Sequence, residues 1–244
     1  MPGSTNTAVP TWHEYADADA LAVGLADALA CVCSDAIGAR SMAWIALAGG
    51  RTPLPAYARL TRAPGIDWGR VVAVATDERC VPFDHPACNT RALMAQFVDS
   101  PGLSVLPLTR PSDGEPDASE LLAQRELNSR AQPFDAVVLG MGGDAHTASL
   151  FPGAPQLAGA LDPRNTLEAI RVDPMPLPPE APFPRITLTA SRLLRAHEIH
   201  VALTGADKRG VLERALASND VTAHPIAIVG RAAPDTRVHL HWSP

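Results

Sequence analysis

The chain has 244 residues, of which 46% are hydrophobic and 19% are charged, and its formal net charge is −6. This length and composition suit a globular α/β protein with a sizeable core, and we expect one domain over residues 1–244. An acidic chain without a basic block is poorly suited to bind nucleic acid or a membrane surface. An anionic ligand would need a local basic cluster.

The cysteines and the N-terminal residues favour a reducing compartment. Cys31, Cys33, Cys80 and Cys88 show no zinc or redox spacing, and the first two lie in an Ala-rich helical pattern as small buried thiols. Residues 1–10 lack the basic and apolar segments of a signal peptide. No window approaches the roughly 18 to 20 apolar residues of a membrane span. We therefore expect a cytoplasmic protein.

Apolar periodicity predicts the elements of the N-terminal half. Residues 13–38 predict a long helix, and the run 41–48 predicts a buried strand that ends at Gly49 and Gly50. Pro53 can open a helix that runs to Leu60, because the first helical turn needs no N–H from it. The next predicted elements are a strand over 71–76, a helix over 89–98, a strand over 105–108 and a helix over 117–130.

The C-terminal half contains a segment that interrupts this alternation. Residues 134–139 predict a buried strand, but residues 152–187 are expected to be irregular. Six prolines between Pro174 and Pro184 exclude a helix or a central strand there. We expect a loop over a site or on the surface. The last predicted elements are strands over 199–203, 226–229 and 238–242 and a helix over 208–217.

Continuously apolar strands that alternate with helices are typical of a mostly parallel, Rossmann-like sheet with helices on both faces. In such α/β folds, ligands bind beyond the carboxyl ends of the strands. Loops 48–52, 76–89, 140–153 and 204–208 each follow an apolar run. We expect these four loops to converge at one edge of the sheet.

The segment from Leu139 to Gly153 is the most informative. Three glycines follow the predicted strand, and Asp144 and His146 come next. A histidine, with an ordinary pKa of about 6.5, exchanges protons near neutral pH. A nearby carboxylate would fix its tautomer or bind substrate. The pattern predicts a catalytic pair of His146 and Asp144.

Two other interpretations of this segment are weaker. Gly140, Gly142 and Ala145 fit the relaxed dinucleotide fingerprint, but a Pro-rich region follows instead of a helix and a strand. A metal site built from the Asp-x-His pair with His85 or Cys88 lacks the usual ligand spacing. We expect no metal.

Two further patterns give little support to other chemistry. His239 and His241 share one face of the last predicted strand, and without a companion ligand we expect a surface pair. No Gly-x-Ser-x-Gly elbow of a serine hydrolase occurs.

The segment from Gly49 to Pro53 joins a strand to a helix. Gly49 and Gly50 allow a ligand to approach the backbone, and the helix N-terminus favours an anion. Thr52 adds a hydroxyl donor and Arg51 adds charge. A tight turn with an exposed arginine is the alternative.

Other charged residues also follow predicted strands. Asp77, Glu78 and Arg79 would orient sugar hydroxyls and a phosphate, or form a solvated turn. Arg185 follows the Pro-rich segment, and Lys208, the only lysine, lies at a strand-to-helix turn. With Arg51, the last two would form a cationic pocket for a dianionic phosphate.

Taken together, four blocks resemble the glucosamine-6-phosphate isomerase/6-phosphogluconolactonase family. The blocks are Gly49 to Pro53; Asp77 to Arg79 with Val81, Pro82 and Asn89; Leu139 to Gly153; and Pro184 and Arg185 with Thr187, Gly205 and Lys208. The resemblance spans about residues 20–240. It implies the fold type of glucosamine-6-phosphate deaminase and ribose-5-phosphate isomerase.

The resemblance implies an enzyme that hydrolyses 6-phospho-D-glucono-1,5-lactone to 6-phospho-D-gluconate in the oxidative pentose phosphate pathway. Such a carboxylic ester hydrolase needs no cofactor. In the deaminase branch an Asn-Glu-Pro run follows the histidine, and its Glu assists that histidine. Here Leu150, Phe151 and Pro152 stand in its place, which favours the lactonase.

The resemblance also implies a set of site residues. His146 and Asp144 would be catalytic. The expected substrate-binding residues are Gly49, Gly50, Arg51, Thr52, Asp77, Arg79, Asn89, Gly142, Arg185 and Lys208. We expect a small-molecule sugar phosphate lactone as substrate and a monomer or weak homodimer. The alternatives are an aminosugar-phosphate isomerase or deaminase with Asp77 as the enolising base, and a sugar-phosphate-binding protein without activity.

The expected mechanism starts with His146 as general base on a water that attacks C1. Backbone N–H groups of the Gly140–Gly143 turn, or Arg79, would stabilise the oxyanion. Two residues depart from the family pattern: Ala145 replaces the usual Gly, and Cys88 replaces the usual Ser. If position 145 needs a positive φ, alanine is strained there by roughly 1 kcal/mol or more.

Overall fold

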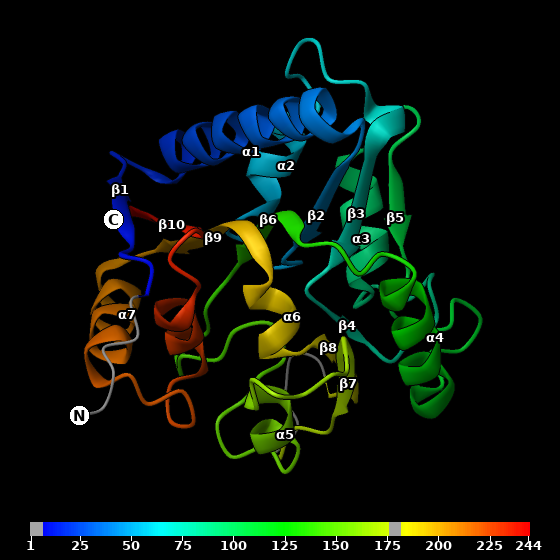
Figure 1. Ribbon diagram of the computed structural model, residues 1–244, viewed down its shortest axis with the longest axis vertical. Coiled ribbons are helices and arrows are strands. Elements are labelled where there is room, and N and C mark those ends of the chain that lie inside the picture. Colours follow the sequence, from blue (N-terminus) through cyan, green and yellow to red (C-terminus); the bar gives the residue numbers. More distant parts are fainter. Residues whose placement is uncertain (1–6, 176–181) are drawn as a thin grey trace.

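The computed structural model describes residues 7–175 and 182–244. A seven-stranded parallel sheet with the order β1-β10-β9-β6-β2-β3-β5 crosses the molecule (Figure 1). Its strands are β1 (Thr11–Glu14), β2 (Ala43–Leu47), β3 (Val71–Ala75), β5 (Ser104–Leu106), β6 (Phe134–Leu139), β9 (Ala196–Thr204) and β10 (Arg237–Ser243). Every residue of β2 and β6 is buried, as expected for strands covered on both faces. The predicted fold class is confirmed.

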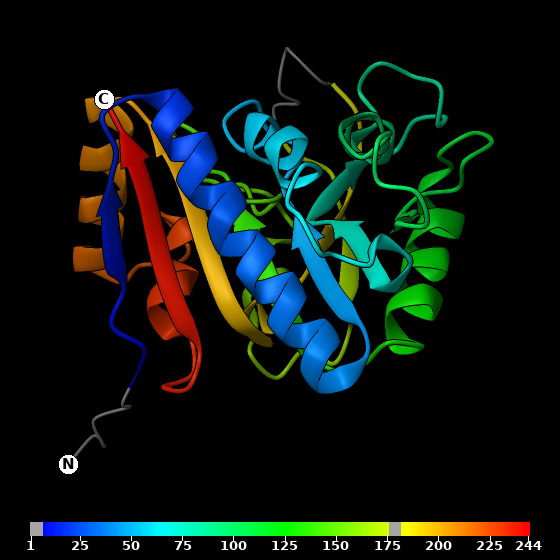
Figure 2. The ribbon, with the colours of Figure 1, turned by 90° about the horizontal axis from the view of Figure 1, so that it is seen from above.

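Helices cover both faces of this sheet. Figure 2 shows α1 crossing one face, and Figure 1 shows α6 and α7 on the other. The helices are α1 (Ala18–Arg40), α2 (Leu54–Leu60), α3 (Asn89–Gln96), α4 (Pro116–Asn128), α5 (Leu157–Leu161), α6 (Ala190–Leu194) and α7 (Ala206–Ser218). They correspond to the predicted helices, with α5 and α6 in addition.

The start of α1 differs from the predicted one. Residues 11–14 form β1 at the sheet edge, and the helix begins only at Ala18. Asp17 sets this start, because its carboxylate accepts a hydrogen bond of 2.8 Å from the Ala20 N–H. Within α1, Cys33 is buried as predicted, but Cys31 is exposed.

By length and composition, α1 also meets the criteria for a membrane-spanning helix, so the expectation that no apolar stretch has this length is wrong. Its leucines explain the apolar character. Leu21, Leu25 and Leu29 are at most 1% exposed and pack in the protein core. The apolar stripe of α1 is therefore used to cover the sheet.

A second, antiparallel sheet lies beside the first. It has the order β4 (Asp77–Arg79), β8 (Arg185–Leu188) and β7 (Ala169–Val172). The prediction of irregular structure over 152–187 is therefore wrong for α5, β7 and the start of β8. Pro184 is tolerated because it precedes β8 and contributes only its carbonyl, which accepts a hydrogen bond from the Cys80 N–H. The prolines at 176, 178 and 179 lie outside the described residues.

The predicted strand over 226–229 is also wrong. Residues Pro225–Arg231 form a 3₁₀ helix whose apolar side chains are buried. A short apolar run does not distinguish a strand from a helical segment, and the proline at its start favours the helix. The Ile226 N–H donates to the Ala145 carbonyl over 3.0 Å, so this segment supports the predicted catalytic loop from behind.

His239 and His241 are not a surface pair. They lie on β10, between β1 and β9, and those strands contribute His13 and His200. His13 Nε2 lies 3.0 Å from His239 Nδ1, and His200 Nδ1 lies 3.1 Å from His241 Nε2. In the described part of the chain, no group of three or more His, Cys, Asp or Glu residues has the geometry of a metal site.

Candidate active site

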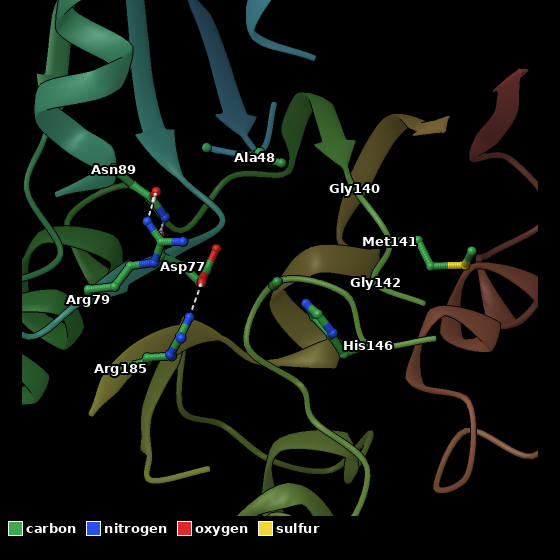
Figure 3. A pocket seen from close by; sticks show the side chains of 12 residues that line it. Ala48, Asp77, Arg79, Asn89, Gly140, Met141, Gly142, His146 and Arg185 are labelled. Carbon is green, nitrogen blue, oxygen red and sulfur yellow. Dashed lines mark hydrogen bonds and ion pairs between the residues drawn. The ribbon is translucent and has the colours of Figure 1, made fainter. Parts of the chain in front are cut away.

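The four predicted loops do converge at the carboxyl edge of the large sheet, where two adjoining cavities open, the first of which is shown in Figure 3. The first is lined by Ala48, Gly49, Gly50, Asp77, Arg79, Asn89, Gly140, Met141, Gly142, His146, Ala148 and Arg185. The second is lined by Ala18, Gly50, Arg51, Thr52, Pro53, Pro55, Gly140, Met141, Ala202, Thr204 and Lys208. Gly50, Gly140 and Met141 line both cavities.

All predicted site residues except Asp144 line one of these cavities. The predicted cationic pocket is divided, however. Arg51 and Lys208 line the second cavity, whereas Arg185 lies in the first, opposite His146 (Figure 3). Arg185 is held there because β8 pairs with β4, which places it beside Arg79 in the register.

Asp144 lies behind His146 and orients it. Its Oδ1 is 2.5 Å from His146 Nδ1 and also accepts a hydrogen bond of 3.2 Å from the His146 N–H. The hydrogen bond from His146 is the largest cause that lowers the pKa of Asp144 below its usual value. An ionised Asp144 accepts the Nδ1 proton, which leaves the neutral imidazole with Nε2 as a proton acceptor.

Backbone geometry holds this loop in place. The Gly142 N–H donates to the His146 carbonyl over 3.0 Å, and the Ala145 N–H donates to the Gly142 carbonyl over 3.1 Å. A Cβ at Gly142 would lie only 2.2 Å from the His146 ring, so this position requires glycine. Ala145 has φ +65°, which is the strained conformation anticipated from the sequence.

A second group of residues faces His146 across the cavity. Arg79 Nη1 donates to Asn89 Oδ1 over 2.7 Å, and Asn89 Nδ2 donates to the Asp77 carbonyl over 2.7 Å. A Cβ at Gly49 would lie 2.2 Å from Asn89 Oδ1. The glycine at position 49 therefore allows Asn89 to reach Arg79 and orient its guanidinium.

Glu78 is buried and binds the backbone of this group, so the Asp77–Arg79 segment is not a solvated turn. Its carboxylate is fully buried and accepts hydrogen bonds from the backbone N–H groups of Asn89, Thr90 and Arg79 over 2.6–2.8 Å. Burial raises the pKa of Glu78, and these hydrogen bonds oppose the rise. The residue thereby caps α3 and fixes the start of the helix that carries Asn89.

Cys88, the second departure from the family pattern, keeps a capping role. Its Sγ accepts a hydrogen bond of 3.4 Å from the Arg91 N–H, and its thiol lies 3.5 Å from Glu78 Oε2. Burial raises the pKa of Cys88 to about 11, so it remains a thiol near neutral pH. It is therefore not a thiolate nucleophile.

Ser149 has a role at the site that was not predicted from the sequence. Its hydroxyl donates to Asp77 Oδ2 over 2.5 Å, and Arg185 Nη1 lies 4.0 Å from the same oxygen. This oxygen of Asp77 is thus already engaged by two groups. The contact joins residues 72 positions apart, and no local pattern signals it.

The second cavity gathers positive charge. Lys208 Nζ donates to the Met141 carbonyl over 2.8 Å, which ties the start of α7 to the loop before His146. Burial and then the nearby charge of Arg51 lower the pKa of Lys208. An anion between these two side chains would offset both effects, because it would compensate the buried charge and the repulsion.

Comparison with known proteins agrees with this architecture. Residues 16–242 match the family of glucosamine-6-phosphate isomerases/6-phosphogluconolactonase. A 6-phosphogluconolactonase from Pseudomonas putida is 36% identical over 95% of this chain and 92% of its own length. The crystal structure of a 6-phosphogluconolactonase from Shewanella baltica is 32% identical, with a TM-score of 0.87 over 97% of this chain and 98% of the other.

A monomeric glucosamine-6-phosphate deaminase shares the fold at 16% identity, with a TM-score of 0.73 over 96% of this chain and 97% of the other. The family match covers nearly the whole chain, and it includes every residue that lines the two cavities. The chain belongs to the glucosamine-6-phosphate isomerase/6-phosphogluconolactonase family.

Proposed function

We propose that this protein hydrolyses 6-phospho-D-glucono-1,5-lactone to 6-phospho-D-gluconate, a step of the oxidative pentose phosphate pathway. The observation that carries the proposal is the His146–Asp144 pair at a cavity that adjoins a cationic cavity. A lactone is an activated ester, so a positioned general base and an anion anchor are enough for its hydrolysis. Relatives of this chain from several bacteria are named 6-phosphogluconolactonase.

In the proposed mechanism, His146 Nε2 takes a proton from a water molecule as the water oxygen attacks C1. The C1 carbonyl becomes an oxyanion, and the bond from C1 to the ring oxygen then breaks. His146 returns its proton to the departing ring oxygen, and the new carboxylic acid releases a proton to solvent. Asp144 stabilises the imidazolium that exists between the two transfers.

Arg79 is the proposed stabiliser of the oxyanion. It lines the cavity, and Asn89 and the Ala87 carbonyl hold its guanidinium in place. The Gly142 N–H is a weaker candidate because it already donates to the His146 carbonyl. A preorganised cation aimed at developing charge lowers the barrier without reorganisation.

The second cavity is the proposed phosphate site. Arg51 and Lys208 would pair with the dianion, and Thr52 would add a hydroxyl donor. Gly50, Gly140 and Met141 line both cavities, and the two glycines leave room there for a sugar that extends from one cavity to the other. The energy of phosphate binding would thereby position C1 next to His146.

A deaminase or isomerase reaction is less well supported. It needs Asp77 as a base, but Oδ2 of this residue accepts a hydrogen bond from Ser149 and lies near Arg185. In addition, Phe151 occupies the place of the Glu that assists the histidine in the deaminase branch.

The proposal is tested by giving the purified protein freshly prepared lactone and subtracting spontaneous hydrolysis. Catalysed acid release is expected. Glucosamine 6-phosphate is the counter-substrate, and ammonia release from it would replace the proposal with a deaminase. Binding of 6-phosphogluconate without turnover of either substrate would identify a non-catalytic binding protein.

We further propose a cytoplasmic protein, monomeric or weakly dimeric, with no nucleic-acid or membrane partner. The net charge of −6 and the use of the apolar face of α1 in the core support this. Light scattering across a range of protein concentrations would measure the oligomeric state.

A further inference from the structure

Phe151 lies against the proposed general base without lining either cavity. A tight turn places it there: the Leu150 N–H donates to the Thr147 carbonyl over 2.9 Å, and Ala148 adopts φ +48°. The chain thus reverses direction directly after His146. The segment after the turn carries Phe151 back toward His146, and the centroids of the two rings lie 4.4 Å apart at an interplanar angle of 34°.

The same phenyl ring contacts a second residue of the site. The guanidinium carbon of Arg185 lies 5.2 Å from the Phe151 ring centroid, within the range of a cation–π contact. Figure 3 shows Arg185 and His146 projecting into the cavity from β8 and from the loop after β6. Phe151, which is 9% exposed, therefore links two side chains that face the substrate from different elements.

The hydrogen bond between Asp144 and the imidazole leaves the tilt of the ring unrestrained. Asp144 holds only Nδ1, and a ring fixed at one atom still tilts about that contact. Gly142 places its backbone close to the ring, because a Cβ there would lie 2.2 Å from Cε1 and Nδ1 of His146, but it contributes no side chain. Phe151 supplies the side chain whose ring packs against the imidazole and opposes its tilt. Being apolar, the phenyl ring also offers no competing proton acceptor.

We propose that Phe151 is a positioning residue for lactone hydrolysis. Its ring fixes the plane of the His146 imidazole, so that Nε2 points at the water that attacks C1. The same ring holds the guanidinium of Arg185 in a constant position relative to the imidazole. The proposal rests on the role of His146 in the proposed function. Small displacements of a general base cost large factors in rate, so the loss of this contact has a kinetic signature.

The experiment compares Phe151→Leu, which removes the ring, with Phe151→Tyr, which retains it. The matched control is Phe134→Leu, because Phe134 is a fully buried core phenylalanine at the opposite, amino end of β6. For each variant, kcat, KM, the Kd of 6-phosphogluconate and Tm are measured.

Phe151→Leu is expected to lower kcat roughly ten- to a hundredfold, with KM and the product Kd within about twofold of wild type. Phe151→Tyr should recover most of the lost kcat. Phe134→Leu should lower Tm at least as much and leave kcat within about twofold. The split between kcat and Kd separates a positioning role from a merely structural one.

Wild-type kcat in Phe151→Leu would overturn the proposal. So would an equal kcat loss in Phe134→Leu, or a loss in Phe151→Leu that appears only in KM. If Phe151→Leu does not fold, Phe151→Met replaces it under the same criteria. Failure of the proposed function is distinguishable, because wild type would then open no lactone, and failure of the proposed role of His146 would appear as undiminished turnover in His146→Ala, whatever the Phe151 variants do.

Discussion

The Nδ1 atom of His146 lies 2.5 Å from Oδ1 of Asp144, two residues earlier in the chain. This spacing is possible because the loop turns sharply at Ala145, where φ is +65°. The carboxylate fixes the tautomer of the imidazole and stabilises its protonated form during turnover. The pair is therefore oriented before substrate arrives, and its geometry depends on a strained residue between its members.

Asp144→Asn should lower kcat by roughly 100-fold or more, because an amide at this position no longer enforces the tautomer with Nε2 free. KM should change little, since Asp144 lines neither cavity. Steady-state kinetics with the lactone measure both constants. The control Asp162→Asn removes an exposed carboxylate elsewhere and should have no effect. Equal kcat values in the two variants would contradict the assigned role of Asp144.

Gly142 and Gly143 allow a sharp comparison. A Cβ at Gly142 would lie 2.2 Å from the His146 ring, whereas a Cβ at Gly143 meets nothing within 4 Å. Gly142→Ala should displace the imidazole and lower kcat by roughly 100-fold, since a misplacement of about 1 Å has effects of this size. Gly143→Ala should retain near-wild-type kcat. Equal activity of the two variants would contradict the close contact between position 142 and the His146 ring.

Lys208→Met should raise KM and the Kd of 6-phosphogluconate by about tenfold or more, because a hydrogen bond to a charged group contributes about 1.5–3 kcal/mol. Saturating rates should be much less affected, since Lys208 lies in the second cavity, away from His146. Arg214→Ala, an exposed change on the same helix, is the control. A variant that lost kcat at unchanged KM would place Lys208 in the chemical step instead.

The buried histidines of β9 and β10 predict a loss of stability in acid. Burial lowers the pKa of His200 and, together with the charges of nearby histidines, lowers that of His241 to about 2. Both are neutral in the fold, whereas the ordinary pKa of histidine is 6.5. Below pH 6.5 the unfolded chain therefore binds protons that the folded chain does not. The stabilisation is complete above this pH and is lost as the pH falls.

Each histidine should contribute a decrease in the free energy of unfolding of up to about 1.4 kcal/mol per pH unit. Urea unfolding at pH 7.5, 6.5 and 5.5 measures the slope. His241→Phe keeps a ring beside His13 and Tyr15 and should flatten the slope, while the exposed His197→Gln should not. A slope that is the same in wild type and His241→Phe would rule out His241 as its source.

Local sequence patterns predicted six of the seven strands of the large sheet, all but β1, and most of the residues that line the two cavities. Buried strands such as β6 are continuous apolar runs, and Gly142, Asp144 and His146 follow β6 directly. In a parallel sheet this position alone brings the loops to one edge. The sequence therefore indicated the site through residues that follow strands.

Contacts between distant segments could not be predicted in this way. The hydrogen bond from Ser149 to Asp77, and the packing of His13 and His200 around β10, depend on strand order. Likewise, Pro225–Arg231 has the same apolar composition as a strand, and its hydrogen bond to Ala145 is a long-range contact that no local pattern signals. These features result from tertiary structure, which the local sequence does not encode separately.

The proposed role of His146 is that of the general base of a lactone hydrolase. It is tested most directly by the rate at which purified wild type and His146→Ala open 6-phospho-D-glucono-1,5-lactone, after subtraction of spontaneous hydrolysis, with Kd for 6-phosphogluconate measured in parallel. We predict a loss of roughly 100-fold or more in kcat, with product binding retained, because general acid–base catalysis contributes factors of this size. Near-wild-type turnover by His146→Ala would show that His146 is not the general base.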